Sequence, residues 1–203
     1  KIGLQELSKV LGDWRAPDVW YQRSIEERNK WDEYVAKESG PTNQELPSYA
    51  HAVGAVYRNS DPSDIVVTAA GGLVGEVVQI WKPKELNTFE TEWGFSCMSY
   101  EISGALGIKM AKPNQDVIVF VGDGSYLLQN SDIYSSVLYD KKLIIVICDN
   151  GGHMVINRLQ LAKGGNEYLC NLKAARATNV QFVDFEAHAK SMGANGETVK
   201  SIS

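Results

Sequence analysis

Two runs of apolar, largely β-branched residues predict buried strands in the middle of the chain, over residues 117–121 and 143–148. Unbroken apolar runs of this kind are typical of parallel strands that are covered on both faces. Between them, apolar residues recur at helical spacing from about residue 127 to residue 139. Residues 116–150 are therefore predicted to form one strand–helix–strand unit with a right-handed crossover and parallel strands.

The same pattern continues upstream of this unit. Residues 65–70 predict another short buried strand, and Gly71-Gly72 precede a helix that runs to about Trp81. Residues 88–91 predict a further short strand, and the later part of residues 93–112 predicts a helix with small residues along it. The expected fold class is α/β, with a doubly wound, mostly parallel sheet and helices on both faces.

The first 60 residues have helical periodicity and a more polar composition. Leu4, Leu7 and Leu11 share one helix face, a second helix follows Pro17, and a third covers residues 49–57. We expect a helical lead-in over residues 1–60 and an α/β domain over residues 61–203. The chain starts with Lys1 and stops in a strand-like stretch near Thr198, which favours a piece of a longer protein whose domain is truncated at its C-terminus.

Composition and charge limit the classes of partner that we expect for this protein. The net charge of −5 argues weakly against nucleic acid and anionic membranes as partners. The three cysteines lack paired or metal-type spacing, and no apolar run is long enough to cross a bilayer. These features favour a reduced, cytoplasmic protein.

Polar residues follow both central strands at the point where each ends. Gly122-Asp123-Gly124-Ser125 follow the first strand, and Asp149-Asn150 follow the second. Because the carboxyl ends of parallel strands share one edge of the sheet, Asp123 and Asn150 are expected to lie together there. One carboxylate and one amide oxygen suit Mg²⁺ that carries a diphosphate, since more carboxylates would repel the phosphates. The glycines permit positive φ and a close approach, and the next helix N-terminus favours phosphate oxygens.

Simpler interpretations of these residues remain open. The Gly-Asp-Gly segment also occurs in ordinary turns, where Asp123 would only cap the following helix. Gly71-Gly72 could be a second phosphate loop or a plain tight turn, and they form no dinucleotide fingerprint. A haloacid-dehalogenase-type phosphatase also has Gly-Asp-Gly after a strand, but its further aspartates are absent from the expected places.

The Gly-Asp-Gly segment, the 24-residue spacer over residues 125–148 and the final Asp149-Asn150 resemble the motif of thiamine-diphosphate-dependent enzymes. The resemblance implies thiamine diphosphate and Mg²⁺ as cofactors, with Asp123, Asn150 and the backbone carbonyl of Gly152 as metal ligands. Asp149 departs from the asparagine of many members, and we expect it to make local hydrogen bonds. The cofactor-binding residues expected on this basis are Gly71, Gly72, Ser96, Cys97, Met98, Gly122, Asp123, Gly124, Ser125, Asn150 and Gly152.

The segment TEWGFSCMSYEISG supports the same resemblance. In the family, a bulky apolar residue at the place of Met98 props the cofactor into a bent shape, and the carbonyl two residues earlier, here on Ser96, accepts from its amino group. Glu101 and its neighbours look most like members that hydrolyse a C–C bond of a cyclic 1,2-diketone in myo-inositol breakdown. Acetolactate synthase, a 2-oxoacid decarboxylase and a non-catalytic domain that keeps the fold are the alternatives.

The resemblance also implies missing parts. The glutamate that activates the cofactor comes from a separate pyrimidine-binding domain of the same or a partner subunit, so no catalytic residue is expected in this chain. The chain alone is expected to be inactive, and the complete protein to be a homodimer or homotetramer that acts on a small molecule. His153 follows the motif and could contact substrate or diphosphate, or be an exposed loop residue.

Overall fold

The computed structural model describes residues 1–176 and 182–202, which form two compact units, residues 1–38 and 39–203. The first unit contains helices α1 (Ile2–Leu11) and α2 (Asp18–Glu38). Gly12, at φ 51°, ends α1, as the leucine spacing and the following glycine predict. Within the described residues, no helix combines the length and apolar character needed to cross a membrane.

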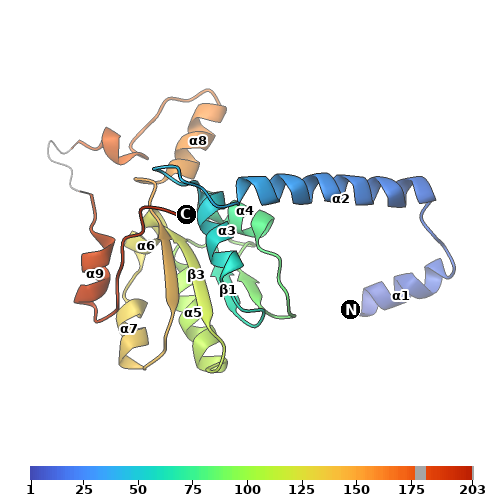
Figure 1. The fold of residues 1–203 in the computed structure, drawn as a ribbon, viewed down its shortest axis with the longest axis horizontal. Coiled ribbons are helices and arrows are strands. Elements are labelled where there is room, and N and C mark those ends of the chain that lie inside the picture. The colour runs from blue at the N-terminus through green and yellow to red at the C-terminus, as the bar shows by residue number, and fades with distance from the viewer. Residues whose placement is uncertain (177–181, 203) are drawn as a thin grey trace. The chain divides into compact units, whose positions relative to one another are not determined.

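The second unit is built on a four-stranded sheet in which every pairing is parallel (Figure 1). Its strands are β1 (Ile65–Thr68), β2 (Phe89–Thr91), β3 (Val117–Gly122) and β4 (Ile144–Cys148), in the order β2-β1-β3-β4. The three β-branched or apolar runs of the sequence are therefore the three adjacent strands β1, β3 and β4. The α/β fold class is confirmed.

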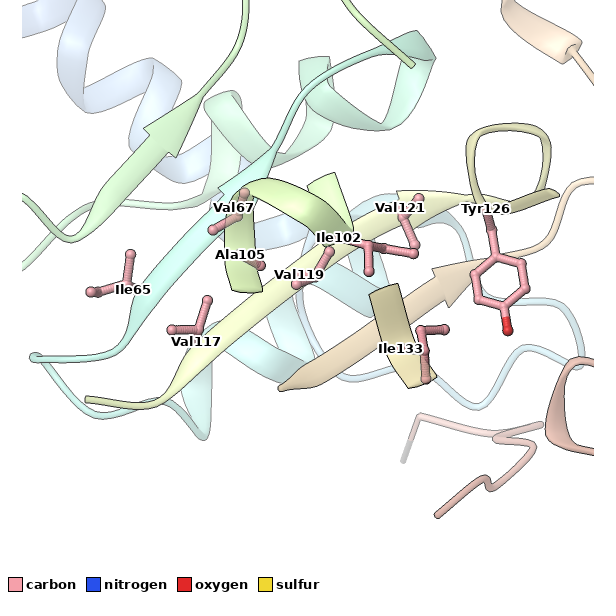
Figure 2. Close-up of a cluster of buried hydrophobic side chains, with 9 residues drawn as sticks. All are labelled: Ile65, Val67, Ile102, Ala105, Val117, Val119, Val121, Tyr126 and Ile133. Carbon is pink, nitrogen blue, oxygen red and sulfur yellow. The ribbon is translucent and has the colours of Figure 1, made fainter. Parts of the chain in front are cut away.

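Helices pack on both faces of this sheet. The helices of this unit are α3 (Tyr49–Arg58), α4 (Gly71–Ile80), α5 (Tyr100–Ala111), α6 (Asp123–Leu128), α7 (Asp132–Leu138), α8 (Met154–Ala162), the 3-10 turn Leu172–Ala174 and α9 (Phe185–Ser191). Successive strand residues point to opposite faces. Figure 2 shows the cluster on one face, where Ile102 and Ala105 of α5 lie against Val119 of β3. On the other face, the ring of Phe120 meets Trp81, which follows α4.

Two sequence expectations differ from the structure. The single helix expected over residues 127–139 is two helices, because Gln129 adopts an extended conformation and a new helix begins at Asp132. Asp132 accepts a hydrogen bond from Ser103 of α5 at 2.5 Å, which ties the start of α7 to its neighbour. The strand expected near Thr198 does not form within the described residues, where Ile202 makes only an isolated bridge to Thr42.

The core predicts a large effect for Ile102, which is fully buried on the side of α5 that packs on the sheet. Ile102→Ala should lower the free energy of unfolding by about 2–5 kcal/mol, since it leaves a cavity in a packed cluster. Ile156→Ala, on the exposed side of α8, removes the same atoms from a side chain that is 46% exposed and should cost under about 1 kcal/mol. Urea denaturation of both variants measures the difference, and equal losses would contradict this view of the core.

Candidate functional site

The ends of β3 and β4 meet at one edge of the sheet. Gly122 is paired in register with Cys148, so the residues that follow these two strands start side by side. The backbone N–H of Gly152 donates to Oδ2 of Asp123 at 2.7 Å. The structure thus joins two of the three residues that the sequence predicts as metal ligands.

Asp123 has an unusual environment for a carboxyl group. Its side chain is buried, and Oδ1 has no hydrogen-bond partner among the described residues. Burial raises the pKa of this carboxyl, the N–H of Gly152 lowers it, and the charge of Asp149 raises it again. A buried carboxylate oxygen without a partner is costly, so this atom is suited to a cation.

Asn150 contacts a residue that sequence reasoning missed. Its Nδ2 donates to the hydroxyl of Tyr49, the first residue of α3. Burial raises the pKa of Tyr49 to about 12, so the hydroxyl stays protonated. The amide donates through nitrogen here, whereas a metal would take its Oδ1. No local pattern signals this contact, because the two residues are 101 positions apart.

Positive φ angles occur in the loop after β4, not after β3. Gly122 has φ −78° and Gly124 is helical, so neither uses the positive φ that a glycine permits. Gly151 and Gly152 adopt φ 76° and 141° instead. Asp149 stabilises this loop by accepting from the N–H of Gly151 at 3.0 Å, which is the local bond expected of it.

The glycines of this region also leave room for close contacts. A Cβ on Gly152 would lie 2.3 Å from the carbonyl oxygen of Cys170, and a Cβ on Gly124 would lie 2.6 Å from Nδ1 of His153. His153 is tied down by its N–H, which donates to the same Cys170 carbonyl at 2.7 Å. The imidazole therefore lies directly against the Gly-Asp-Gly segment.

The second glycine pair lies at the start of α4. Gly71 has φ 86°, a conformation that favours glycine. The guanidinium of Arg158, from α8, fills the space beside Gly72, where a Cβ would lie 2.4 Å from Nη2. Arg158 is a second residue that sequence reasoning missed, because nothing in its own helix marks it as a neighbour of α4.

A hollow of about 320 Å³ opens beside these glycines. Its lining includes Gly71, Gly72 and Gly75 of α4, together with Trp93 and Ser96 of the loop after β2. Two segments predicted separately from the sequence therefore face one space.

The loop that carries Ser96, Cys97 and Met98 is exposed but ordered by hydrogen bonds. The carboxylate of Glu92 accepts from Phe95 N–H at 2.8 Å and from Cys97 N–H at 2.7 Å. These two N–H groups hold the pKa of Glu92 below its usual value, with Cys97 contributing most. Cys97 is exposed, and Met98 is 39% exposed.

The far end of this loop is joined to the Gly-Asp-Gly segment. The hydroxyl of Ser99 donates to the carbonyl of Ser125 at 2.7 Å, and both side chains are buried. Glu101, two positions after Ser99, is fully buried and its Oε1 accepts from Ala70 N–H at 3.2 Å. Burial raises the pKa of Glu101. Glu101 thus supports the turn that leads into Gly71 and Gly72.

Among residues 1–176 and 182–202, no cluster of three His, Cys, Asp or Glu side chains could hold a metal ion. A metal at Asp123 would therefore draw on amide and backbone oxygens as well. Such a mixed set of oxygen ligands suits Mg²⁺, which usually keeps few protein carboxylates when it binds phosphates.

The parallel sheet, the glycine turns at its carboxyl edge and the Asp123 site define a class of cofactor-binding domain. Residues 69–203 match the family described as thiamine pyrophosphate enzyme, C-terminal TPP binding domain. The match spans more than half of the chain, so the chain belongs to this family. Thiamine pyrophosphate is the same compound as thiamine diphosphate, and the resemblance seen in the sequence is confirmed.

Curated relatives point to one group within the family, named 3D-(3,5/4)-trihydroxycyclohexane-1,2-dione hydrolase. The Halalkalibacterium halodurans protein is 38% identical over 70% of this chain and 22% of its own length. The Lacticaseibacillus casei protein is 38% identical over 83% of this chain and 26% of its own length. The Geobacillus thermodenitrificans protein is 28% identical over all of this chain and 36% of its own length. The chain thus spans well under half the length of these relatives.

The loop after β4 predicts a strong glycine requirement. Gly152→Ala should destabilise the chain by about 1–3 kcal/mol, because φ 141° strains an alanine and the Cys170 carbonyl blocks its Cβ. Gly107→Ala is the control, since this exposed helical glycine has no atom within 4 Å of a new Cβ, and it should be neutral or stabilising. Urea denaturation compares the two, and a neutral Gly152→Ala would show that the loop adopts another conformation.

Proposed function

We propose that this chain binds the diphosphate of thiamine diphosphate through Mg²⁺ held at Asp123. The observation that carries the proposal is the Asp123 carboxylate. One of its oxygens is fixed by Gly152 N–H, and the other is buried without a hydrogen-bond partner in the part of the chain that the structure describes. Asn150 and the carbonyl of Gly152 complete the protein ligands in this proposal. The family match supports the cofactor, and the buried oxygen supports the metal.

Neighbouring residues surround the phosphates in this proposal. Gly124 and Ser125 follow Asp123 in α6, with Gly122 before it, and their backbone is assigned to the phosphate oxygens. Gly71 and Gly72 approach from α4, and the Arg158 guanidinium supplies a positive charge beside them. Arginine binds phosphates well because its planar group offers several donors at once.

The organic part of the cofactor is assigned to the hollow and its loop. Ser96 lines the hollow, and Met98 and Cys97 follow it in the same loop. The Ser96 carbonyl would accept from the cofactor's amino group, and Met98 would set its bent shape. When bound, the cofactor supplies an electron sink for the cleavage of a bond beside a carbonyl. The protein's share is to hold and orient the cofactor.

We infer that the reaction is hydrolytic cleavage of a C–C bond in a cyclic 1,2-diketone. The names of the relatives support this substrate class. The glutamate that activates the cofactor would come from a pyrimidine-binding domain of the same or a partner subunit, in a homodimer or homotetramer. The chain alone would then be inactive.

The metal assignment predicts that Asp123→Asn removes Mg²⁺-dependent binding of thiamine diphosphate. The substitution keeps the shape of the side chain but removes the charge that the cation needs, so affinity should fall by at least about 100-fold. Isothermal calorimetry of the protein that carries this chain, with and without Mg²⁺, measures the effect.

Asp140→Asn is the matched control. Asp140 is an exposed turn residue at φ 51°, a conformation that asparagine tolerates, so this variant should bind as the native protein does. Native affinity in Asp123→Asn, with both variants folded, would overturn the proposed function.

The charge beside Gly72 predicts a selective effect of Arg158→Gln. Affinity for thiamine diphosphate should fall by about three- to tenfold, while affinity for thiamine without phosphates should not change, because the guanidinium is assigned to the diphosphate. Lys163→Gln, at the C-cap of α8, removes the same charge away from Gly72 and should change neither affinity. Equal losses for both ligands in Arg158→Gln would place the arginine elsewhere in the site.

A further inference from the structure

We propose that Glu92 is a positioning residue, which fixes the loop of residues 93–98 as a preformed wall of the hollow. The inference rests on the proposed function, because it concerns the part of the cofactor that enters this hollow. Glu92 directly follows β2, so its backbone is anchored by the sheet. Trp93 and Ser96 line the hollow, so the loop that Glu92 holds lies at the site.

The clamp is a carboxylate that spans the turn around Ser96. Its two oxygens bind different groups, with Oε1 accepting from Phe95 N–H and Oε2 from Cys97 N–H. These two residues are the neighbours of Ser96 on either side. The Cys97 N–H belongs to the peptide unit that contains the Ser96 carbonyl, and the Phe95 N–H belongs to the Gly94–Phe95 unit. The two bonds from one carboxylate therefore restrict the backbone on both sides of Ser96, including the peptide unit of its carbonyl.

Backbone strain shows why the loop needs such a clamp. Ser96 and Ser99 adopt φ 52° and 78°, a region that non-glycine residues rarely occupy. Strained backbone persists only where its surroundings hold it, and it often gathers at functional sites. Here Glu92 holds the first strained serine, and the bond from Ser99 to Ser125 holds the second.

Packing does not explain the loop's order. All six residues of 93–98 are exposed, and the Phe95 side chain is 90% exposed. A loop without buried side chains gains little from the hydrophobic core, so its conformation depends on hydrogen bonds. A carboxylate bound to two N–H groups is a strong source of such order.

The position of the Glu92 clamp predicts that its loss affects turnover more than cofactor affinity. The diphosphate end is assigned to Asp123, Asn150 and the α4 glycines, whereas the hydrogen bonds of Glu92 go to Phe95 and Cys97. Losing the clamp should therefore leave most of the cofactor's affinity and reduce the turnover that depends on the Ser96 wall. A purely structural residue would lower stability and affinity together.

Amide hydrogen exchange tests the clamp without cofactor or substrate. In the protein that carries this chain, Glu92→Gln should speed exchange in peptides covering residues 93–98 by about threefold or more, because an amide cannot accept through both of its terminal atoms. Glu90→Gln is the matched control, since it makes the same change on an exposed residue of β2, two positions earlier. Exchange in that variant should match the native protein.

The same variants are then compared in cofactor titration and turnover of the cyclic diketone. Glu92→Gln should lower kcat by about tenfold or more while the Kd for thiamine diphosphate stays within about threefold of native. Unchanged exchange in Glu92→Gln would overturn the inference, as would faster exchange with native kcat. Failure of the proposed function would show differently, as native cofactor affinity in the metal-ligand variant.

Discussion

The parallel pairing of β3 with β4 is the constraint on which the site depends. Their register places Gly122 opposite Cys148, so the segments that follow the two strands begin side by side at one edge of the sheet. The hydrogen bond from Gly152 N–H to Asp123 then joins the segment after β4 to the segment after β3. Without this pairing, the carboxylate and the amide that follow the strands would lie on unrelated parts of the surface.

Several elements around this edge position its polar groups through hydrogen bonds. The turn before α4 carries Gly71 and Gly72, and it is held by the hydrogen bond from Ala70 N–H to the buried Glu101. The loop after β2 is held by Glu92 at one end and by Ser99 at the other. Because these links use backbone groups, the geometry depends on few side chains. Asn150 and Arg158 are exposed at this edge.

Sequence patterns predicted the sheet well because buried parallel strands have a direct signature. Residues 117–121 are apolar throughout since both faces of β3 are covered, and the structure extends this strand only to Gly122. The helix expected after it failed at Gln129, where apolar spacing continues although the backbone becomes extended. Of the apolar residues in this stretch, Ile133 is buried, whereas Leu127, Leu128 and Leu138 are exposed. The apolar spacing therefore reported neither the break between the two helices nor which side chains are buried.

Some residues of the candidate site could be predicted from the sequence and others could not. Asp123 and Asn150 were predicted to be neighbours because each follows a strand whose pairing is predictable. Tyr49 and Arg158 were missed, since their contacts join elements far apart in the sequence. The choice of Gly151 and Gly152 over Gly122 for positive φ depends on how the loop meets Cys170, which no local pattern contains.

A crystal structure of the protein with thiamine diphosphate and Mn²⁺ in place of Mg²⁺ tests the central claim most directly, because anomalous scattering locates the metal itself. The account predicts one strong peak about 2.1 Å from Oδ1 of Asp123, with Asn150 Oδ1 and the Gly152 carbonyl as further ligands. A fully occupied cofactor with its metal bound elsewhere, and with Asp123 Oδ1 still unpartnered, would contradict it.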